Sequence, residues 1–193
     1  MNKRQKQLYN TYLRQRKISK NYTYYEIIHF IEIGHSLNDL RPRDAILGQI
    51  LRYRPELIDL YNKETFDRMS LMTIGYILYH QPQLHTKLPT ENIRSSDMKH
   101  IFIKHPQMIK HLDWTTKLSY ADIADIITAQ PTIVDYDNEI VKHLNVSEIM
   151  EVLFERPELF HKLPLHKLRP NDVKYLIECM PELEQEFIKL GMV

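Results

Sequence analysis

The sequence predicts an all-α protein, a right-handed-type α-solenoid of about six to seven short two-helix repeats with an N-terminal capping helix. Three observations predict this class. A proline recurs every 24 to 27 residues, apolar residues precede each proline at helical spacing, and only four glycines occur in 193 residues. Because Asn-Gly and Asp-Gly pairs are also absent, an all-β fold with many tight turns is not favoured.

The recurring prolines set the register of the repeat. They are Pro55, Pro82, Pro106, Pro131, Pro157 and Pro181. A period near 25 residues with small slips is typical of helical repeat arrays. Proline suits the first position of a helix, where its missing N–H costs no hydrogen bond. Each proline therefore predicts that one helix has just ended and that a second, short helix begins.

The residues eight, five and four positions before each proline are apolar, and so is the residue two positions after it. The first three share one face of an α-helix, because their spacing is i, i+3 and i+4. These columns form the predicted core: Leu47, Ile50, Leu51, Leu57, Ile74, Ile77, Leu78, Leu84, Met98, Ile101, Phe102, Met108, Ile123, Ile126, Ile127, Ile133, Ile149, Val152, Leu153, Leu159, Val173, Leu176, Ile177 and Leu183.

Helix starts are marked twelve residues before several prolines. A side chain able to cap a helix stands there with a partner three residues later, as in Ser70 with Thr73, Ser119 with Asp122 and Asn145 with Glu148. The same offsets identify a degenerate unit upstream, with Thr23 and Glu26 in the capping columns and His35 in place of the proline. The array therefore spans residues 22–193.

Residues 1–21 form a separate segment, predicted to be a basic amphipathic helix that caps the array. Leu8, Tyr9, Tyr12 and Leu13 share one helical face and basic residues surround it. Two helices within about 25 residues are both short, and short isolated helices are marginal in water. The stability of the array must therefore come from stacking between neighbouring repeats.

One stretch carries a resemblance to known repeats. Residues 104–131 resemble the roughly 25-residue Gln-Pro and Asp-Trp repeats of uncharacterised bacterial and phage proteins. The residues that carry it are Pro106, Asp113, Trp114, Leu118, Asp122, Gln130 and Pro131. The unit length also resembles that of leucine-rich-repeat-variant solenoids, which alternate an α-helix with a shorter helix. The resemblance implies a solenoid and brings no activity with it.

The sequence lacks the motifs of the common enzyme classes, so we expect no enzymatic activity and no cofactor. It contains no Gly-rich phosphate loop and no Gly-x-Ser-x-Gly elbow. Histidine pairs such as His80 and His85 stand five residues apart, a poor spacing for two ligands on one helix face, and no metal site is predicted. The single cysteine, Cys179, is expected to be a partly buried structural residue rather than a reactive thiol.

The location is predicted to be the cytoplasm, with no membrane contact. No run reaches the 18 or more apolar residues of a membrane span, and the N-terminus is basic rather than an apolar export signal. A lone cysteine is ordinary in a reducing compartment.

Charge is distributed unevenly along the chain, and the N-terminal part is basic. Residues 1–54 carry eleven basic and four acidic side chains, although the formal net charge of the whole chain is only +1. Cations can neutralise phosphates and tyrosines can stack on unpaired bases. The candidate nucleic-acid contacts are Lys3, Arg4, Lys6, Arg14, Arg16, Lys17, Lys20, Tyr22 and Tyr24. The alternative is a solvated cap whose tyrosines pack on the first repeat.

The later part of the chain is acidic. Residues 119–160 carry two basic and nine acidic side chains. The candidate protein-binding residues are Asp135, Asp137, Glu139, Glu148, Glu151, Glu155 and Glu158. They could dock a basic surface of another protein or occupy a nucleic-acid groove on one. They could also pair with the basic end of a second copy of this chain, or form an ordinary solvated face.

The function that the sequence favours is a non-enzymatic protein–protein interaction module, such as an adaptor or an inhibitor. Repeat arrays present extended surfaces rather than a single pocket. The alternative is a nucleic-acid-binding protein that uses the basic, Tyr-rich N-terminus. The identity of the partner and the oligomeric state are not predicted.

Overall fold

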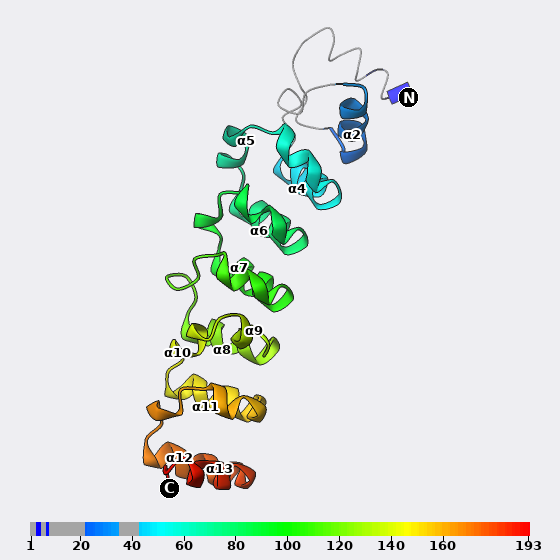
Figure 1. Cartoon of the computed structure of the whole chain (residues 1–193). Coiled ribbons are helices and arrows are strands. Elements are labelled where there is room, and N and C mark those ends of the chain that lie inside the picture. The colour runs from blue at the N-terminus through cyan, green and yellow to red at the C-terminus, as the bar shows by residue number, and fades with distance from the viewer. Residues whose placement is uncertain (1–2, 5–6, 8–21, 35–42) are drawn as a thin grey trace. The chain divides into compact units, whose positions relative to one another are not determined.

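The computed structural model describes residues 3–4, 7, 22–34 and 43–193, and every regular element among them is helical (Figure 1). The chain divides into two compact units, Met1–Asp97 and Met98–Val193, and each is described by itself. In the predicted cap, Lys3, Arg4 and Gln7 are helical, and the other residues of segment 1–21 lie outside the described part. His35, the predicted proline equivalent of the degenerate unit, also lies outside it.

Unit 1 alternates α-helices with short 3₁₀ segments. Its elements are α2 (Tyr24–Glu32), α4 (Asp44–Tyr53), η1 (Pro55–Leu60), α5 (Lys63–Asp67), α6 (Leu71–His80), η2 (Pro82–Thr86) and η3 (Thr90–Asn92). Helix α4 packs beside α6, and α2 contacts α4. Helix α7 (Ser95–Lys104) contains the division between the two units.

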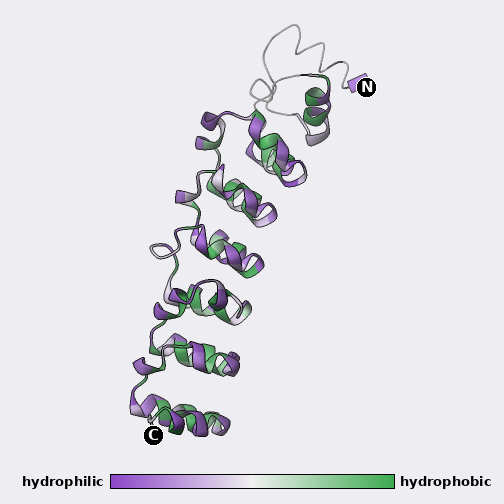
Figure 2. Cartoon of the chain, viewed as in Figure 1, coloured by the Kyte–Doolittle hydropathy of each residue, from purple (hydrophilic) through white to green (hydrophobic). Residues whose placement is uncertain are grey.

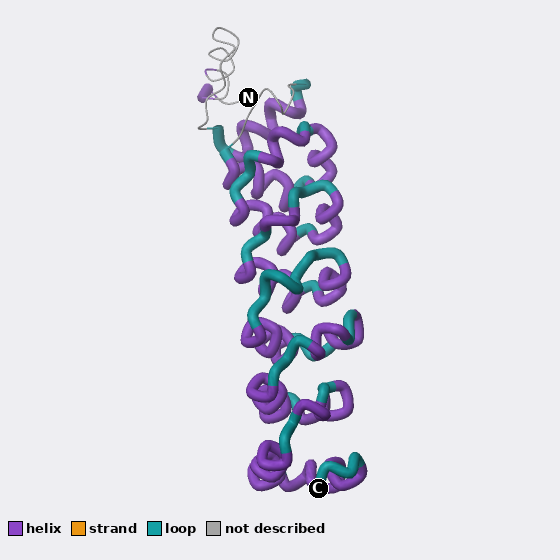
Figure 3. The backbone as a smooth tube through the Cα atoms, turned by 90° about the vertical axis from the view of Figure 1, so that its left-hand side faces the viewer, coloured by secondary structure: helices purple, strands orange, loops and turns teal. Residues whose placement is uncertain are grey.

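Unit 2 continues the same alternation. Its further elements are η4 (Pro106–Lys110), α8 (Tyr120–Ala129), α9 (Ile133–Tyr136), α10 (Glu139–Lys142), α11 (Val146–Glu155), η5 (Pro157–Lys162), η6 (Leu165–Lys167), α12 (Pro170–Cys179), η7 (Pro181–Leu183) and α13 (Glu184–Lys189). Helices α8 and α11 pack against each other, and α9 packs on η4. Figure 3 shows the loops that join these helices within each unit.

The predicted helix starts are confirmed. Ser119 and Asp122 form a reciprocal capping box, and Ser70 and Asn145 accept backbone N–H groups of the first turns that follow them. Thr23 caps α2 in the same way, so the degenerate unit does begin with a helix. A further cap was not predicted: Asp172 accepts both the backbone N–H and the guanidinium of Arg169.

The ten-residue helices α4, α6, α7, α8, α11 and α12 all end with the same backbone geometry. The residue before the key proline has φ between −133° and −139° and ψ between 65° and 75°. Its N–H donates to the carbonyl four residues earlier at 2.7 to 2.8 Å. A residue that precedes proline avoids the α region, and this conformation stops the helix.

The second helix of each repeat is shorter and more tightly wound than the α-helix that precedes it. All the key prolines except Pro131 occupy the first turn of a 3₁₀ segment, and Pro131 begins a turn that leads into α9. The predicted order of helix, sharp break and short helix is therefore confirmed. The 3₁₀ geometry was not predicted, because local sequence does not distinguish one or two 3₁₀ turns from a short α-helix.

The predicted core is buried, with one exception. Of its 24 positions, 23 are at most 7% exposed. The residue five positions before the proline is 0% exposed for all six key prolines. Figure 2 shows hydrophobic and hydrophilic residues on different sides of the ten-residue helices. The exception is Ile177, which is half-buried because α12 is followed by the short η7 and α13 rather than by another ten-residue helix.

A side-chain hydrogen bond links successive repeats within each unit. The residue before the key proline donates to a carbonyl near the end of the preceding ten-residue helix: Gln81 to Arg52 at 2.5 Å, Gln130 to Ile103 at 3.1 Å and Arg156 to Thr128 at 2.7 Å. The last carbonyls of a helix have no partner within it. The Gln-Pro pair of the repeat therefore satisfies a carbonyl of the neighbouring repeat while it ends its own helix.

The capping box at the start of α8 predicts a pH-dependent contribution to stability. The Ser119 hydroxyl donates to Asp122 at 2.7 Å and lowers the pKa of that carboxyl. A group whose pKa is lowered on folding stabilises the protein above its unfolded pKa, about 3.9, and loses this contribution as the pH falls through the folded pKa. We expect Asp122→Asn to lower the free energy of unfolding by up to about 1 kcal/mol at pH 6.

The same comparison should show little difference at a pH below the lowered pKa of Asp122, where this carboxyl is protonated in both the folded and the unfolded protein. Urea unfolding of the wild type and the variant at the two pH values measures this. A deficit that is equally large at both values would contradict the assigned role of the Asp122 carboxylate.

Within the described residues, no helix combines the length and apolar character required to cross a bilayer.

Candidate interaction surfaces

The outer side of unit 1 carries a continuous series of aromatic rings. Tyr24 of α2 lies edge-on to Tyr25 and to Tyr53 of α4, with ring centroids 5.3 and 5.9 Å apart. On α6, Tyr76 and His80 are in edge contact at 4.7 Å. Tyr25 is 77% exposed and Tyr53 58% exposed. We call these five residues, together with Arg52, the aromatic surface.

Arg52 joins the two halves of the aromatic surface. Its guanidinium carbon lies 5.0 Å from the centroid of Tyr53 and 5.8 Å from that of Tyr76. One guanidinium N–H donates to the Tyr76 hydroxyl at 2.7 Å, which raises the pKa of Arg52. Stacking and this hydrogen bond hold the guanidinium plane in place, and its other N–H groups remain able to bind an anionic group.

The predicted N-terminal contacts are only partly covered by the structure. Lys3 and Arg4 are exposed, and Arg4 pairs with Glu26 at 3.1 Å. Tyr22 is buried and packs its ring against Phe30 at 5.2 Å. Its ring therefore cannot stack on a base and instead fits the alternative in which tyrosines pack on the first repeat. The other cations proposed for this role lie outside the described residues: Lys6, Arg14, Arg16, Lys17 and Lys20.

The predicted acidic residues do not form one surface. Three are paired with cations: Asp135 with Lys162, Glu139 with Lys142, and Glu158 with Arg156. The other four lie elsewhere. Asp137 follows α9 and accepts the N–H of Glu139 at 3.0 Å, whereas Glu148, Glu151 and Glu155 all belong to α11.

Only two residues on α11 present carboxylates to solvent without a cation. Glu148 is half-buried, and its Oε2 is buried and accepts no hydrogen bond from the described residues. Glu151 and Glu155 are exposed and form no ion pair within the described part of the chain. They are one helical turn apart and share a face of α11. We call Glu151 and Glu155 the acidic pair.

An exposed aromatic pair adjoins the acidic pair. Phe154 of α11 and Tyr175 of α12 are in edge contact at 6.2 Å, and they are 42% and 50% exposed. Phe154 lies between Glu151 and Glu155 in the sequence. The two helices therefore combine exposed rings with uncompensated negative charge.

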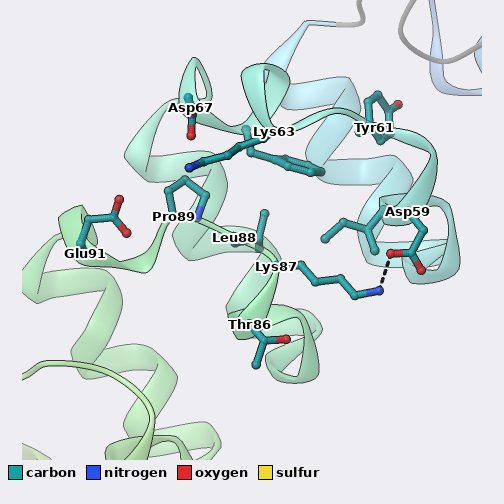
Figure 4. A pocket seen from close by; sticks show the side chains of 11 residues that line it. Asp59, Tyr61, Lys63, Asp67, Thr86, Lys87, Leu88, Pro89 and Glu91 are labelled. Atoms are coloured by element: carbon teal, nitrogen blue, oxygen red, sulfur yellow. Dashed lines mark hydrogen bonds and ion pairs between the residues drawn. The ribbon is translucent and has the colours of Figure 1, made fainter.

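Unit 1 also contains a hollow of ≈ 550 Å³ beside η1 and η2 (Figure 4). Lys87 and Asp59 form an ion pair at one end of it, and Asp67, Pro89 and Glu91 lie toward the other. Tyr61 is buried at its wall, and burial raises the pKa of this phenol above its usual value. The Asp59–Lys87 pair links two successive repeats, as Asp135–Lys162 does in unit 2, so this polar lining is part of the repeat packing.

The described residues contain no cluster of side chains suited to bind a metal ion. No group of three or more His, Cys, Asp or Glu side chains is arranged there to hold a metal ion. The expectation that Cys179 is partly buried was wrong, because this residue is exposed. It lies two residues before Pro181, in the same column as the exposed Tyr53 and Glu155, on the outer side of its helix.

The residues that carry the Asp-Trp resemblance are structural in this chain. Trp114 is 4% exposed and packs edge-on against His143 at 4.9 Å. Gln130 bonds to the preceding repeat and Asp122 caps α8.

Comparison with models of protein families, with curated proteins and with solved structures finds no match to the chain.

Proposed function

We propose that the chain is a non-enzymatic protein-binding module, built as a right-handed α-solenoid of about six to seven two-helix repeats. Its partner presents a basic surface, which docks on the acidic pair and on the Phe154–Tyr175 ring pair. The module works as an adaptor or an inhibitor, since it holds its partner without chemical change.

The observation that supports this proposal is the uncompensated charge of Glu151 and Glu155 beside exposed rings. By contrast, Asp135, Glu139 and Glu158 of the acidic segment are each paired with a lysine or arginine of their own or the next repeat. Complementary charge speeds the encounter with a basic partner and selects against acidic ones. Aromatic side chains contribute much of the binding energy at protein interfaces.

Charge reversal tests the proposal. The full chain carrying Glu151→Lys and Glu155→Lys is compared with wild type in affinity capture from nuclease-treated lysate of the natural host. The matched control carries Glu182→Lys and Glu184→Lys, which change the same charge at exposed residues of the same unit. We expect the wild type and the control to retain a stoichiometric protein partner and the first variant to lose it.

Two results would contradict the proposal. One is equal retention of the partner by all three chains, which would exclude the acidic pair as the docking site. The other is the absence of any protein partner from the nuclease-treated lysate while wild type captures nucleic acid from untreated lysate, which would favour the alternative function of the basic N-terminus.

A further inference from the structure

We infer that the aromatic surface of unit 1 binds single-stranded nucleic acid. Bases would stack on the exposed rings of Tyr25 and Tyr53, and a backbone phosphate would bind the guanidinium of Arg52. This surface belongs to the described part of unit 1 and differs from the protein-binding site proposed on unit 2, so the two proposals stand independently.

The ring geometry suits stacking. The contacts between the rings are edge contacts, with interplanar angles of 81° for Tyr24 and Tyr25 and 67° for Tyr24 and Tyr53. An edge contact leaves much of a ring face uncovered, in agreement with the high exposure of Tyr25 and Tyr53. Stacking on aromatic faces is the main sequence-independent contact between proteins and unpaired bases.

A hollow next to the rings has room for a base. It measures ≈ 540 Å³, and its lining includes Tyr24, Tyr25, Arg43 and Gln49. It therefore combines two ring walls with a cation and an amide. These are the groups that stack on a base, attract a phosphate and form hydrogen bonds with base edges.

The charge of these helices favours an anionic ligand over a cationic one. Helix α6 contains no Asp or Glu, and the only acid of α4, Asp44, accepts the N–H of Ser70. On α2, Glu26 is buried in its capping box. The pKa of Arg54 is raised mainly by its hydrogen bond with Glu56, and the nearby charge of Glu32 adds a smaller effect. The chain also enters α2 from a segment, residues 1–25, with seven cations and no acid.

An acidic polypeptide could use Arg52, but it would leave the rings without their best contact. Nucleobases have two flat faces that match exposed rings, whereas Asp and Glu side chains have none. The alternation of rings with one fixed guanidinium therefore favours nucleic acid over an acidic protein.

Fluorescence anisotropy with the full chain tests this inference. The probes are a labelled oligothymidylate of about 16 nucleotides, a duplex of the same length and a polyglutamate of matched charge. We expect wild type to bind the single strand in preference to the other two. Tyr25→Ala and Tyr53→Ala should each weaken binding about fivefold or more, and Tyr25→Phe and Tyr53→Phe should retain it.

The salt dependence separates the roles of the rings and of Arg52. Arg52→Gln should reduce the slope of log affinity against log salt by about 0.7, the value for one phosphate contact on a single strand. The tyrosine variants should leave this slope unchanged. The control carries Tyr120→Ala and Tyr136→Ala, which remove similarly exposed tyrosines from unit 2 and should bind as wild type does.

Several outcomes would overturn the inference. Undiminished binding by the Tyr25→Ala, Tyr53→Ala double variant would assign the nucleic acid to the basic segment alone. Stronger binding of the duplex, binding of polyglutamate instead, or no binding by wild type would also exclude it. The Tyr25→Ala, Tyr53→Ala double variant retains the surface of unit 2. Its capture of the protein partner therefore tests the proposed function separately.

Discussion

Replacing Phe102 with alanine is expected to lower the free energy of unfolding by about 3 to 5 kcal/mol. Phe102 is 0% exposed and stands four residues before Pro106, a position that is buried in every repeat except the last, where it is Ile177. Removing its ring leaves a cavity that the surrounding helices cannot fill without shifting. The loss of transfer free energy and the cavity both contribute to the expected effect.

Urea unfolding followed by circular dichroism measures this change. Phe154→Ala serves as the control, since Phe154 is also on a ten-residue helix but is 42% exposed, and its loss should cost within about 1 kcal/mol. Equal destabilisation by the two substitutions would show that the proline-based columns do not define the core.

Gly75→Ala is the second substitution with a large expected effect, about 1 to 3 kcal/mol of destabilisation. Alanine favours a helix over glycine, so an increase in stability would be the ordinary expectation for α6. A Cβ at residue 75 would lie 2.7 Å from both Cβ and Cγ of Asp97 in the first turn of α7. Asp97 is itself held by two hydrogen bonds from Arg94, so it cannot move away freely.

Gly48→Ala provides the matched comparison. Gly48 and Gly75 both lie seven residues before their prolines, and a Cβ at residue 48 would lie 3.2 Å from the terminal methyl of Thr73. That contact requires only a small shift, and the gain in helix propensity of about 1 kcal/mol offsets it. Thermal unfolding should show a clear loss for Gly75→Ala and little change for Gly48→Ala. A gain in stability for Gly75→Ala would contradict the close approach at this position.

The sequence was sufficient to predict the core and the helix boundaries, because both depend on local spacing. The positions of Ile77, Ile101 and Ile126 relative to their prolines determine which helix face they occupy, and the structure buries all three. Capping by Ser119 was equally predictable, since its partner Asp122 is three residues away.

The surface could not be predicted in this way, because its contacts join residues one repeat apart. Asp135 and Glu155 look alike in the sequence, yet Asp135 is neutralised by Lys162 and Glu155 has no cation among the described residues. Of the aromatic surface, only Tyr24 was predicted as a binding residue, since Tyr53 and Tyr76 meet around Arg52 only when α4 and α6 stack. The period of about 25 residues is the signal that could have identified both surfaces, by comparing equivalent columns.

The key prolines have a structural role. The proposed binding therefore uses the solvent-facing positions of the ten-residue helices. Pro82 and Pro157 begin 3₁₀ segments, while the residues before them, Gln81 and Arg156, bond to the preceding repeat. The residues six and two positions before each proline have no such structural role in α11, where they are Glu151 and Glu155.

Site-specific photocrosslinking tests the proposal that a protein partner docks on this outer face of α11. A photoreactive amino acid is placed at position 155 in one chain and at position 184 in another, and each is irradiated in nuclease-treated host lysate. We expect one dominant crosslinked protein from position 155 and none from position 184, although Glu155 and Glu184 are both exposed. The same crosslink from both positions, or from position 184 alone, would contradict it.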